Sequence, residues 1–598
     1  MSETSERAFD PDALRERYRV ERDKRLRADG NEQYVEMKGE YAHYLQDPYI
    51  AEQIEREPLT EEVDVVLIGG GFGGLQAGAR LRQAGVKDLR IIEKGGDFGG
   101  TWYWNRYPGA QCDVEAYCYL PLLEELDYVP TEKYAYAREI LSHSANIGRH
   151  FDLYDSALFQ TEVTGLEWDE SDRRWIVSTN RGDTLRARFV SMANGPLHRA
   201  KLPGISGIGS FKGHSFHTSR WDYDYTGGGP DGGLDKLGDK RVGIIGTGAT
   251  AIQCVPFLGE GAKQLYVFQR TPSTVDVRGN SPTDPSWAES LEEGWQKERM
   301  ENFNALISGV PQEVDLVDDG WTDLIGKMMS NFQKARKGEN LNVAEIMEMA
   351  NFEKMEEIRA RVDSLVDDPD TAEKLKPYYK MFCKRPTFND EYLPTFNLPN
   401  VELIDTDGQG VERITEKGVV VAGVEYELDC LIYGTGFEVG TSYTRRSGYD
   451  VIGAGGAKLS EYWEEGTRTL HGMGSHGFPN LFIMNTSQGG FTANFPHLLD
   501  ESAVHQAHII ASALDAGHTR VEVQKEAEDK WVETILGFAG GPLGGLGGPD
   551  CTPGYYNNEG QPNPNAAQSA PYGGGSIRFF KLLEEWREDG SFEGLEFK

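Results

Sequence analysis

Residues 63–74 read VDVVLIGGGFGG, a short apolar run that ends in a cluster of glycines. The apolar run predicts a buried parallel strand, and the residues that follow have the spacing of a helix through Leu81. In such a turn Gly69 permits the tight bend, Gly71 lets the backbone approach a pyrophosphate, and Gly74 lets helix and strand pack closely. The stretch therefore predicts a dinucleotide-binding Rossmann unit.

The next predicted strand, residues 89–92, is followed by an acid. This residue, Glu93, lies 24 residues after Gly69. A carboxylate at this point can accept hydrogen bonds from the ribose hydroxyls of an adenine dinucleotide. A glycine turn alone is weak evidence, but here strand, turn, helix and acid follow one another in the expected order. The first site therefore suits FAD, with NAD as the alternative.

A second copy of the pattern begins at residues 241–245, RVGII. After the next strand, residues 264–268, Arg270 again lies 24 residues after the first glycine. An arginine can pair with a 2′-phosphate that an acid would repel, so this site suits NADPH. The alternative for Arg270 is a solvated residue at a strand end. The predicted cofactor contacts are Gly246, Thr247, Gly248, Ala249, Thr250, Ala251, Ile252, Arg270 and Thr271.

Two such turns predict an α/β protein with two Rossmann-like dinucleotide-binding domains, the NADP domain inserted into the FAD domain. Predicted strands at residues 189–193 and 428–433 both end in glycine turns and bracket the inserted unit. The predicted order is a helical N-terminal extension (1–60), the first segment of the FAD domain (61–200), an NADP domain (201–390) with a helical insertion at about 285–380, the second segment of the FAD domain (391–545), and a mobile loop with the C-terminal segment (546–598).

The composition excludes several classes of partner. The chain has 61 Lys and Arg against 96 Asp and Glu, a net charge of −35 that should repel nucleic acid and anionic membranes. The six cysteines form no CxxC pair, which predicts buried reduced thiols and no metal site. The N-terminus lacks a signal-peptide core, and no apolar run is long enough for a membrane helix. We expect a soluble cytoplasmic protein, a monomer or weak homo-oligomer.

Three further motifs occur in a fixed order. Residues 99–113 match GGxWxxxxYPGxxxD, residues 211–222 match FxGxxxHxxxW(P/D), and residues 384–385 are a Lys-Arg pair. With these motifs the sequence resembles the type I Baeyer–Villiger monooxygenases, FAD- and NADPH-dependent flavoproteins that convert ketones to esters or lactones with dioxygen. The resemblance covers about residues 61–560.

The resemblance implies roles for a cation and an acid. Oxygenation of a ketone through a flavin peroxide needs a fixed positive charge beside the negative oxygen, and arginine stays charged at every working pH. The matching catalytic residues are Arg385 and its orienting partner Asp113, while Lys384 would assist Arg270 at the 2′-phosphate. The alternative is an interdomain salt bridge without catalysis. The residues expected to couple the two domains as a hinge are Phe211, Gly213, His217 and Trp221.

The remaining cofactor contacts follow from the same resemblance. Aromatic residues of the first motif would pack on the flavin, although such a cluster is otherwise ordinary core. Family members often carry a tryptophan that touches the nicotinamide, in a loop near the C-terminal end of the chain that we call the late loop. At the equivalent position this chain has Tyr555. The contacts implied are Thr101, Trp102, Trp104, Asp113 and Tyr119 for FAD, and Gln111, Cys112, Lys384, Arg385 and Tyr555 for NADP.

The substrate class is implied only by analogy. The N-terminal extension and the late loop resemble the subgroup that acts on large cyclic, macrocyclic or steroid ketones, and sulfide oxidation is expected as well. One alternative is a flavin monooxygenase acting on nitrogen or sulfur, against which Trp221 argues. A disulfide reductase would need a closer pair than Cys112 and Cys118. The remaining alternative is a non-catalytic NADP-binding sensor.

Overall fold

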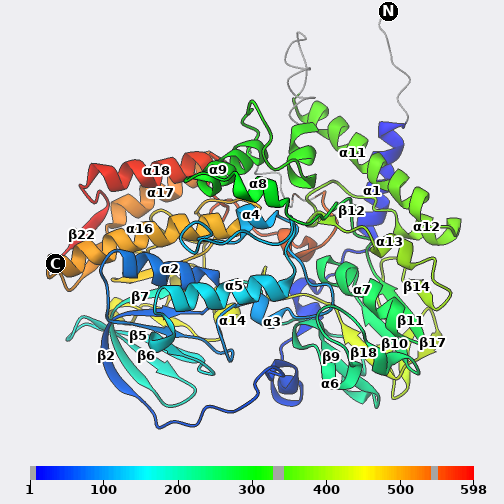
Figure 1. Cartoon of the computed structure of the whole chain (residues 1–598), viewed down its shortest axis with the longest axis horizontal. Coiled ribbons are helices and arrows are strands. Elements are labelled where there is room, and N and C mark those ends of the chain that lie inside the picture. The colour runs from blue at the N-terminus through cyan, green and yellow to red at the C-terminus, as the bar shows by residue number, and fades with distance from the viewer. Residues whose placement is uncertain (1–8, 328–342, 540–547, 549) are drawn as a thin grey trace, which may run out of the picture.

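The computed structural model describes residues 9–327, 343–539, 548 and 550–598. Two sheets lie side by side with helices above them (Figure 1). Among the described residues no helix combines the length and apolar composition needed to cross a membrane. The longer helices are α1 (Pro11–Asp23), α2 (Phe72–Gln83), α5 (Ala137–His150), α7 (Ala249–Gly261), α9 (Trp295–Ile307), α11 (Val343–Leu365), α16 (Phe495–Asp515), α17 (Lys525–Gly537) and α18 (Ser576–Asp589).

Shorter helices lie between these. They are α3 (Thr101–Trp104), α4 (Ala116–Tyr119), α6 (Tyr223–Thr226), α8 (Pro285–Glu289), α12 (Pro369–Leu375), α13 (Tyr392–Thr395), α14 (Tyr443–Ser447) and α15 (Leu459–Tyr462). The small strand groups are β1 (Tyr34–Val35) with β8 (Leu202–Pro203), β12 (Val275–Asp276) with β13 (Thr387–Phe388), β15 (Arg413–Ile414) with β16 (Gly418–Val421) and β17 (Val424–Glu427), and β21 (Val521–Val523) with β22 (Leu595–Phe597).

The first sheet has eight strands within the described residues, in the order β19-β5-β6-β7-β2-β3-β4, with β20 paired to β7. Helix α2 packs against α16, where Gln76 donates to the carbonyl of Pro496 at 3.0 Å and Arg80 forms a bidentate pair with Asp500. The strands are β2 (Thr60–Ile68), β3 (Leu89–Ile92), β4 (Ala157–Leu158), β5 (Val163–Asp169), β6 (Arg174–Thr179), β7 (Thr184–Met192), β19 (Val451–Ile452) and β20 (Leu481–Ile483).

The second sheet is parallel, and its five strands in the described residues run β14-β11-β10-β18-β9. Because β19 and β20 follow it in the chain and join the first sheet, the predicted insertion of one unit into the other is confirmed. The strands are β9 (His214–His217), β10 (Arg241–Ile245), β11 (Gln264–Gln269), β14 (Val401–Asp405) and β18 (Cys430–Tyr433).

The boundary predicted at residue 391 is wrong. Strand β14 pairs with β11 through Val401 and Leu265, and β18 pairs with β10 through Cys430 and Val242. The chain therefore stays in the second unit until Tyr433. The composition changes near residue 391 because the helical insertion ends there, while the parallel sheet around it still needs two more strands.

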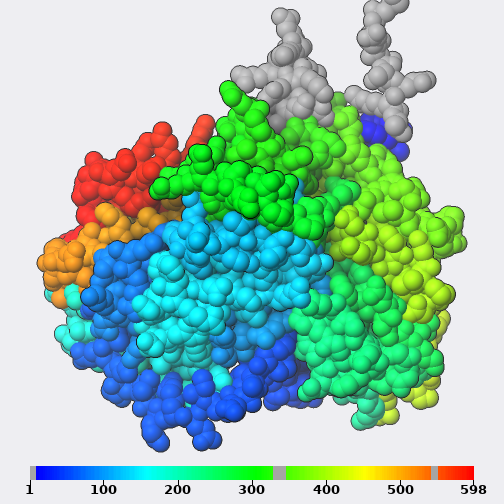
Figure 2. Space-filling model, viewed as in Figure 1, coloured from blue at the N-terminus to red at the C-terminus, as the bar shows by residue number. Residues whose placement is uncertain are grey.

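The helical insertion contains α8, α9, α11 and α12 among its described residues. Figure 2 shows the green segment around α8 and α9 directly against the cyan surface of the first unit. The N-terminal extension is less helical than predicted. After α1, which packs Tyr18 against Phe352 of α11, it continues mainly as irregular chain with the 3-10 segments η1 (Gly30–Gln33) and η2 (Gly39–Leu45). Gly30 and Gly39 have positive φ, which interrupts a helix.

Two of the six cysteines are not free thiols. Cys383 and Cys551 form a disulfide, whereas Cys112, Cys118, Cys254 and Cys430 are free and buried. The prediction of six reduced thiols is therefore wrong for this pair. The two residues are 168 positions apart in the sequence, a separation that no local spacing rule detects. Residues 546, 547 and 549 of the segment predicted to begin with a mobile loop (546–598) lie outside the described residues.

Candidate active site

The first glycine turn leaves no room for side chains at two of its positions. Gly69 has φ 111°, and a Cβ there would lie 2.5 Å from the carbonyl oxygen of Ala193, the residue after β7. A Cβ on Gly74 would lie 1.8 Å from the carbonyl oxygen of Gly69. Real Cβ atoms do not approach other atoms so closely, so α2 begins directly against the turn. This cradle fits a pyrophosphate at the start of the helix.

Glu93 lies at the end of β3, beside this turn. It is buried, and its two oxygens accept hydrogen bonds from the amides of Gly70 and Gly95, each at 2.7 Å. Burial raises the pKa of Glu93, and the two amides oppose that rise. Each carboxylate oxygen keeps a second lone pair, so Glu93 can still accept from a ribose hydroxyl.

The second turn has the same shape at its first glycine. Gly246 has φ 121°, and a Cβ there would lie 2.3 Å from the carbonyl oxygen of Gly434. The Thr247 hydroxyl donates to the carbonyl of Thr271 at 2.7 Å and joins the turn to the end of β11. Arg270 follows β11 and donates to Gln33 of the N-terminal extension at 2.6 Å.

A cavity of about 2270 Å³ connects the two turns. Most predicted cofactor residues line it: Gly69, Gly71, Glu93, Thr101, Trp102, Trp104, Gln111, Cys112, Asp113, Tyr119, Gly246, Thr247, Gly248, Ala249, Thr250, Arg270, Thr271, Lys384, Arg385 and Tyr555. Three predicted contacts do not. Gly74 serves the packing of α2, Ala251 is fully buried in α7, and the amide of Ile252 already bonds to Gly248 inside that helix. Ala251 and Ile252 lie on the side of α7 that faces the sheet, and this side of a Rossmann helix packs in the core.

Arg385 and Asp113 meet in the cavity wall. The guanidinium donates to the carboxylate from both Nη1 and Nη2, with Nη2 at 2.7 Å from Oδ1. Burial alone would raise the pKa of Asp113, but Arg385 outweighs it and holds that pKa below its ordinary value. Burial likewise opposes the charge of Arg385, and Asp113 keeps the pKa of the arginine well above its usual value. Both groups therefore stay charged.

Trp321 of the helical insertion completes this region of the wall. Its indole nitrogen donates to the carbonyl of Asp113 at 3.1 Å, and its ring lies 5.6 Å from the Arg385 guanidinium. The insertion thus positions the charged pair through the backbone as well as by contact with the side chain. Sequence reasoning missed Trp321, because it lies in a segment without a motif.

Lys384, the neighbour of Arg385, lines the cavity near Arg270. Its ammonium donates to the carbonyl of Pro553 at 3.0 Å. Burial, and then the positive charge of Arg270, lower the pKa of Lys384 to about 8. The two cations predicted to share a phosphate therefore act on one another in the structure.

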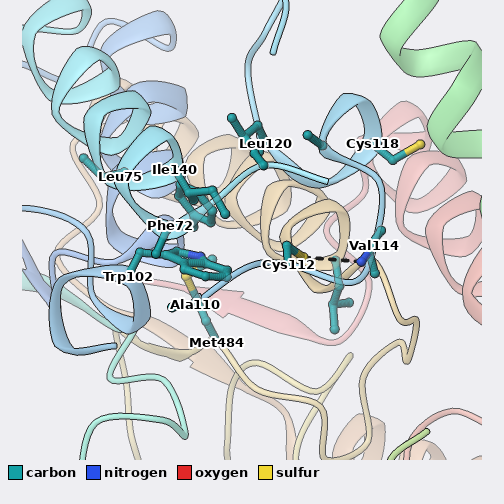
Figure 3. Close-up of a cluster of buried hydrophobic side chains, with 14 of the residues drawn as sticks. Phe72, Leu75, Trp102, Ala110, Cys112, Val114, Cys118, Leu120, Ile140 and Met484 are labelled. Atoms are coloured by element: carbon teal, nitrogen blue, oxygen red, sulfur yellow. Dashed lines mark hydrogen bonds between the residues drawn. The ribbon is translucent and has the colours of Figure 1, made fainter. Parts of the chain in front are cut away.

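The aromatic motif forms part of the cavity wall beside the first glycine turn. Trp102 is buried, and its indole nitrogen donates to the hydroxyl of Tyr119 at 3.2 Å. Figure 3 shows Phe72, Ala110 and Met484 around Trp102. The sulfur of Cys112 accepts from the amide of Val114 at 3.4 Å, the dashed line of that figure. The cluster is both core and cavity wall, because Trp102 and Tyr119 also line the cavity.

The motif at residues 211–222 lies away from the cavity. Its residues 214–217 form β9, where His217 pairs with Tyr433 at the end of β18. His217 is fully buried, and burial lowers its pKa to about 3, so the imidazole is neutral. A Cβ on Gly213 would lie 2.4 Å from the ring of Phe211, and the buried Trp221 donates to Thr226 at 3.1 Å.

The structure adds residues that the sequence motifs missed. Lys201 and Glu559, both almost fully buried, line the cavity near Arg270 together with Gln33 and Tyr34. Their positions depend on the N-terminal extension and the late loop folding over the second turn. No spacing pattern in the sequence connects segments so far apart.

Two Rossmann units that share one cavity, with an acid at one turn and an arginine at the other, define an oxidoreductase with two dinucleotide-binding domains. A model of the NAD(P)-binding Rossmann-like domain family matches residues 67–127. Among curated proteins, neopentalenolactone D synthase of Streptomyces avermitilis is 54% identical over 593 residues, which span 98% of this chain and 99% of that protein.

A Baeyer–Villiger monooxygenase of Streptomyces coelicolor is 51% identical over 585 residues, 97% of this chain and 96% of that protein. The solved structure of a polycyclic ketone monooxygenase from the thermophilic fungus Thermothelomyces thermophila matches with a TM-score of 0.90 and 40% identity, covering 98% of this chain and 99% of that one. The chain belongs to the Baeyer–Villiger monooxygenases.

Proposed function

We propose that this enzyme uses FAD and NADPH to convert bulky cyclic, polycyclic or steroid-like ketones to esters or lactones with dioxygen, and that it also oxidises sulfides. The observation that carries the proposal is the Arg385–Asp113 pair in the wall of a cavity that connects both nucleotide turns. The volume of about 2270 Å³ suits two cofactors and a large substrate. The similarity to a polycyclic ketone monooxygenase supports the bulky substrate.

FAD fits the first turn. Backbone amides at Gly71 and the start of α2 would bind the pyrophosphate, Glu93 would accept from the ribose, and Trp102 with Tyr119 would flank the ring system. When bound, the flavin supplies the redox chemistry, accepting a hydride from NADPH and activating dioxygen. The protein's share is to bind and orient both cofactors and to keep water away.

NADPH fits the second turn. Its pyrophosphate would lie against the amides at Gly248 and the start of α7, and its 2′-phosphate would pair with Arg270 and Lys384. Tyr555 of the late loop lines the same cavity and is the proposed contact to the nicotinamide.

Arg385 is the proposed catalytic cation. It would place a permanent positive charge where negative charge develops on oxygen during attack on the ketone carbonyl. Asp113 fixes the guanidinium by two hydrogen bonds and prevents it from turning away from the site. Trp321, packed near the guanidinium, would exclude water from the same position.

The motif at residues 211–222 is proposed to couple the two units. Its strand β9 is held by β18, whose last residue Tyr433 precedes the return of the chain to the first sheet. A shift of the second unit would therefore move β9 together with the point where the chain returns to the first sheet. His217→Ala should lower turnover while FAD stays bound, and a flavin-free variant would contradict this role.

The deciding experiment measures NADPH oxidation by the flavin-loaded enzyme with a panel of ketones from cyclohexanone to steroids, and counts ¹⁸O from labelled dioxygen in the products by mass spectrometry. We expect one labelled oxygen in an ester or lactone, with bulky ketones turned over best. Efficient sulfoxide formation from a thioether without lactone from any ketone would favour the alternative of a heteroatom monooxygenase.

We also infer the assembly state and the location of the protein. A net charge of −35 favours a monomer or weak homo-oligomer, because self-repulsion opposes association. We propose that it works in the cytoplasm. Size-exclusion chromatography with light scattering tests the oligomeric state, and a stable tetramer would contradict the proposal.

A further inference from the structure

Glu559 is a buried acid in the cavity wall near Arg270. The cofactor contacts proposed above give it no role. It is 3% exposed and lies in the 3-10 segment η9 (Tyr555–Gly560). Its Oε1 accepts from the Tyr34 hydroxyl at 3.2 Å, whereas its Oε2 has no hydrogen-bond partner among the described residues. A buried carboxylate oxygen without a partner is costly, so its position needs a physical reason.

Cations surround this carboxylate without bonding it closely. Lys201 Nζ lies 3.7 Å from Oε1, and Arg270 Nη2 lies 3.8 Å from Oε2. The negative charge of Glu559 also acts on Lys384, where it opposes the lowering of the lysine pKa. The distances exceed those of direct hydrogen bonds. One carboxylate thus sits loosely among three positive groups, two of which are the predicted 2′-phosphate ligands.

We propose that Glu559 occupies the subsite of the coenzyme 2′-phosphate and that NADPH displaces it, so that this acid sets the affinity for the phosphorylated coenzyme. The inference rests on the proposed function, in which Arg270 and Lys384 bind that phosphate. A phosphate monoester carries about −1.5 to −2 charges and three acceptor oxygens, so it pairs with the same cations better than a carboxylate does. Two anions in one subsite repel each other, so Glu559 must leave when the phosphate enters.

The local backbone makes this displacement feasible. Asn558 and Glu559 have φ 53° and 54°, the left-handed region that side chains rarely adopt. The N-terminal extension holds them there, because Asn31 donates to the Asn558 side chain at 2.7 Å and Gln561 donates to the carbonyl of Arg27 at 2.6 Å. The strained backbone and the unpaired oxygen lower the cost of releasing this segment.

The test titrates the flavin-loaded enzyme with 2′,5′-ADP and with 5′-ADP by calorimetry. Glu559→Gln keeps the shape and the Tyr34 contact but removes the charge. We expect this variant to bind 2′,5′-ADP at least about five-fold more tightly than the wild type, and 5′-ADP equally well. The matched control is Glu412→Gln, an acid of the same cavity wall that has its own partner in the Gly423 amide at 3.1 Å. It should change neither affinity.

The outcomes distinguish a failure of the proposed NADPH site from a failure of the proposed role of Glu559. If the wild type binds 2′,5′-ADP no more tightly than 5′-ADP, the proposed NADPH site is wrong, and the role of Glu559 falls with it. If the wild type shows the preference and Glu559→Gln leaves it unchanged or weakens it, the role of Glu559 alone is overturned. Glu559→Asp, which keeps the charge, should bind like the wild type, whereas a purely structural role would alter both variants.

Discussion

The two glycine turns of this protein are alike where the backbone demands it and different where the ligand does. Gly69 and Gly246 both have positive φ, and both face the carbonyl oxygen of the residue after a neighbouring strand, Ala193 after β7 and Gly434 after β18. Five residues on, the first unit has Gly74 where the second has Ala251. The first glycine is therefore set by strand geometry, and the later position by how closely the helix approaches its own turn.

The ends of the second strands differ in charge. Glu93 follows β3, and Arg270 follows β11. An acid can accept from ribose hydroxyls and an arginine can attract a phosphate, so the two proposed nucleotide sites differ by a single position in each copy of the fold. Arg385 and Asp113 then join the two copies, because the acid comes from the first unit and the arginine from the segment inserted with the second.

The largest expected effect comes from breaking that junction. Arg385→Ala should lower ester or lactone formation by about 100- to 1000-fold, because a fixed charge at a developing oxyanion is lost. NADPH oxidation should continue, since neither glycine turn is touched. Product analysis with parallel NADPH and hydrogen peroxide assays measures both. Arg385→Lys is the matched variant, and it should stay impaired because an ammonium cannot form the bidentate pair with Asp113. Lactone formation at the wild-type rate in Arg385→Ala would leave the pair with a structural role only.

The next effect tests the charge difference between the turns. Arg270→Ala should raise KM for NADPH by about 10- to 100-fold, the range expected for lost charge-assisted hydrogen bonds, and should leave KM for NADH unchanged. Steady-state kinetics with both coenzymes measure it. The matched control is Arg138→Ala, an exposed arginine paired with Asp231 on the surface, which should change neither constant. Equal losses with the two coenzymes would show that Arg270 does not recognise the phosphate.

The helix spacing predicts an asymmetry between Gly74 and Ala251. Gly74→Ala places a Cβ 1.8 Å from the Gly69 carbonyl, so α2 must move, at a cost of about 1–3 kcal/mol and some FAD occupancy. Ala251→Gly in the other unit removes a methyl and costs only about 0.5–1 kcal/mol. Thermal unfolding and flavin absorbance of the two variants give the comparison. Similar stability and full flavin in both would mean that the two helices are equally distant from their turns.

The sequence predicted those regions of the site that depend on local spacing. The glycines, Glu93 and Arg270 each follow a strand directly, so their places at the edge of a parallel sheet could be worked out from the chain alone. The Arg385–Asp113 pair spans 272 residues and was expected only through the family resemblance. Glu559 and the Cys383–Cys551 disulfide arise where distant segments fold over the second turn, and no local pattern encodes such contacts. The boundary at residue 391 failed for a related reason, since a composition change marks a helical insertion but not the end of a sheet.

The smallest effect concerns the pH dependence of the second site. Burial and Arg270 lower the pKa of Lys384 to about 8, so its ammonium is charged below pH 8 and neutral above it in the free enzyme. A bound phosphate favours the charged form, so binding above pH 8 requires proton uptake. We expect the affinity for 2′,5′-ADP to fall by up to about five-fold between about pH 8 and 9. Lys384→Arg keeps its charge throughout and should remove the decline, while 5′-ADP serves as the control ligand without a 2′-phosphate. A decline that persists in Lys384→Arg would assign the titration to another group.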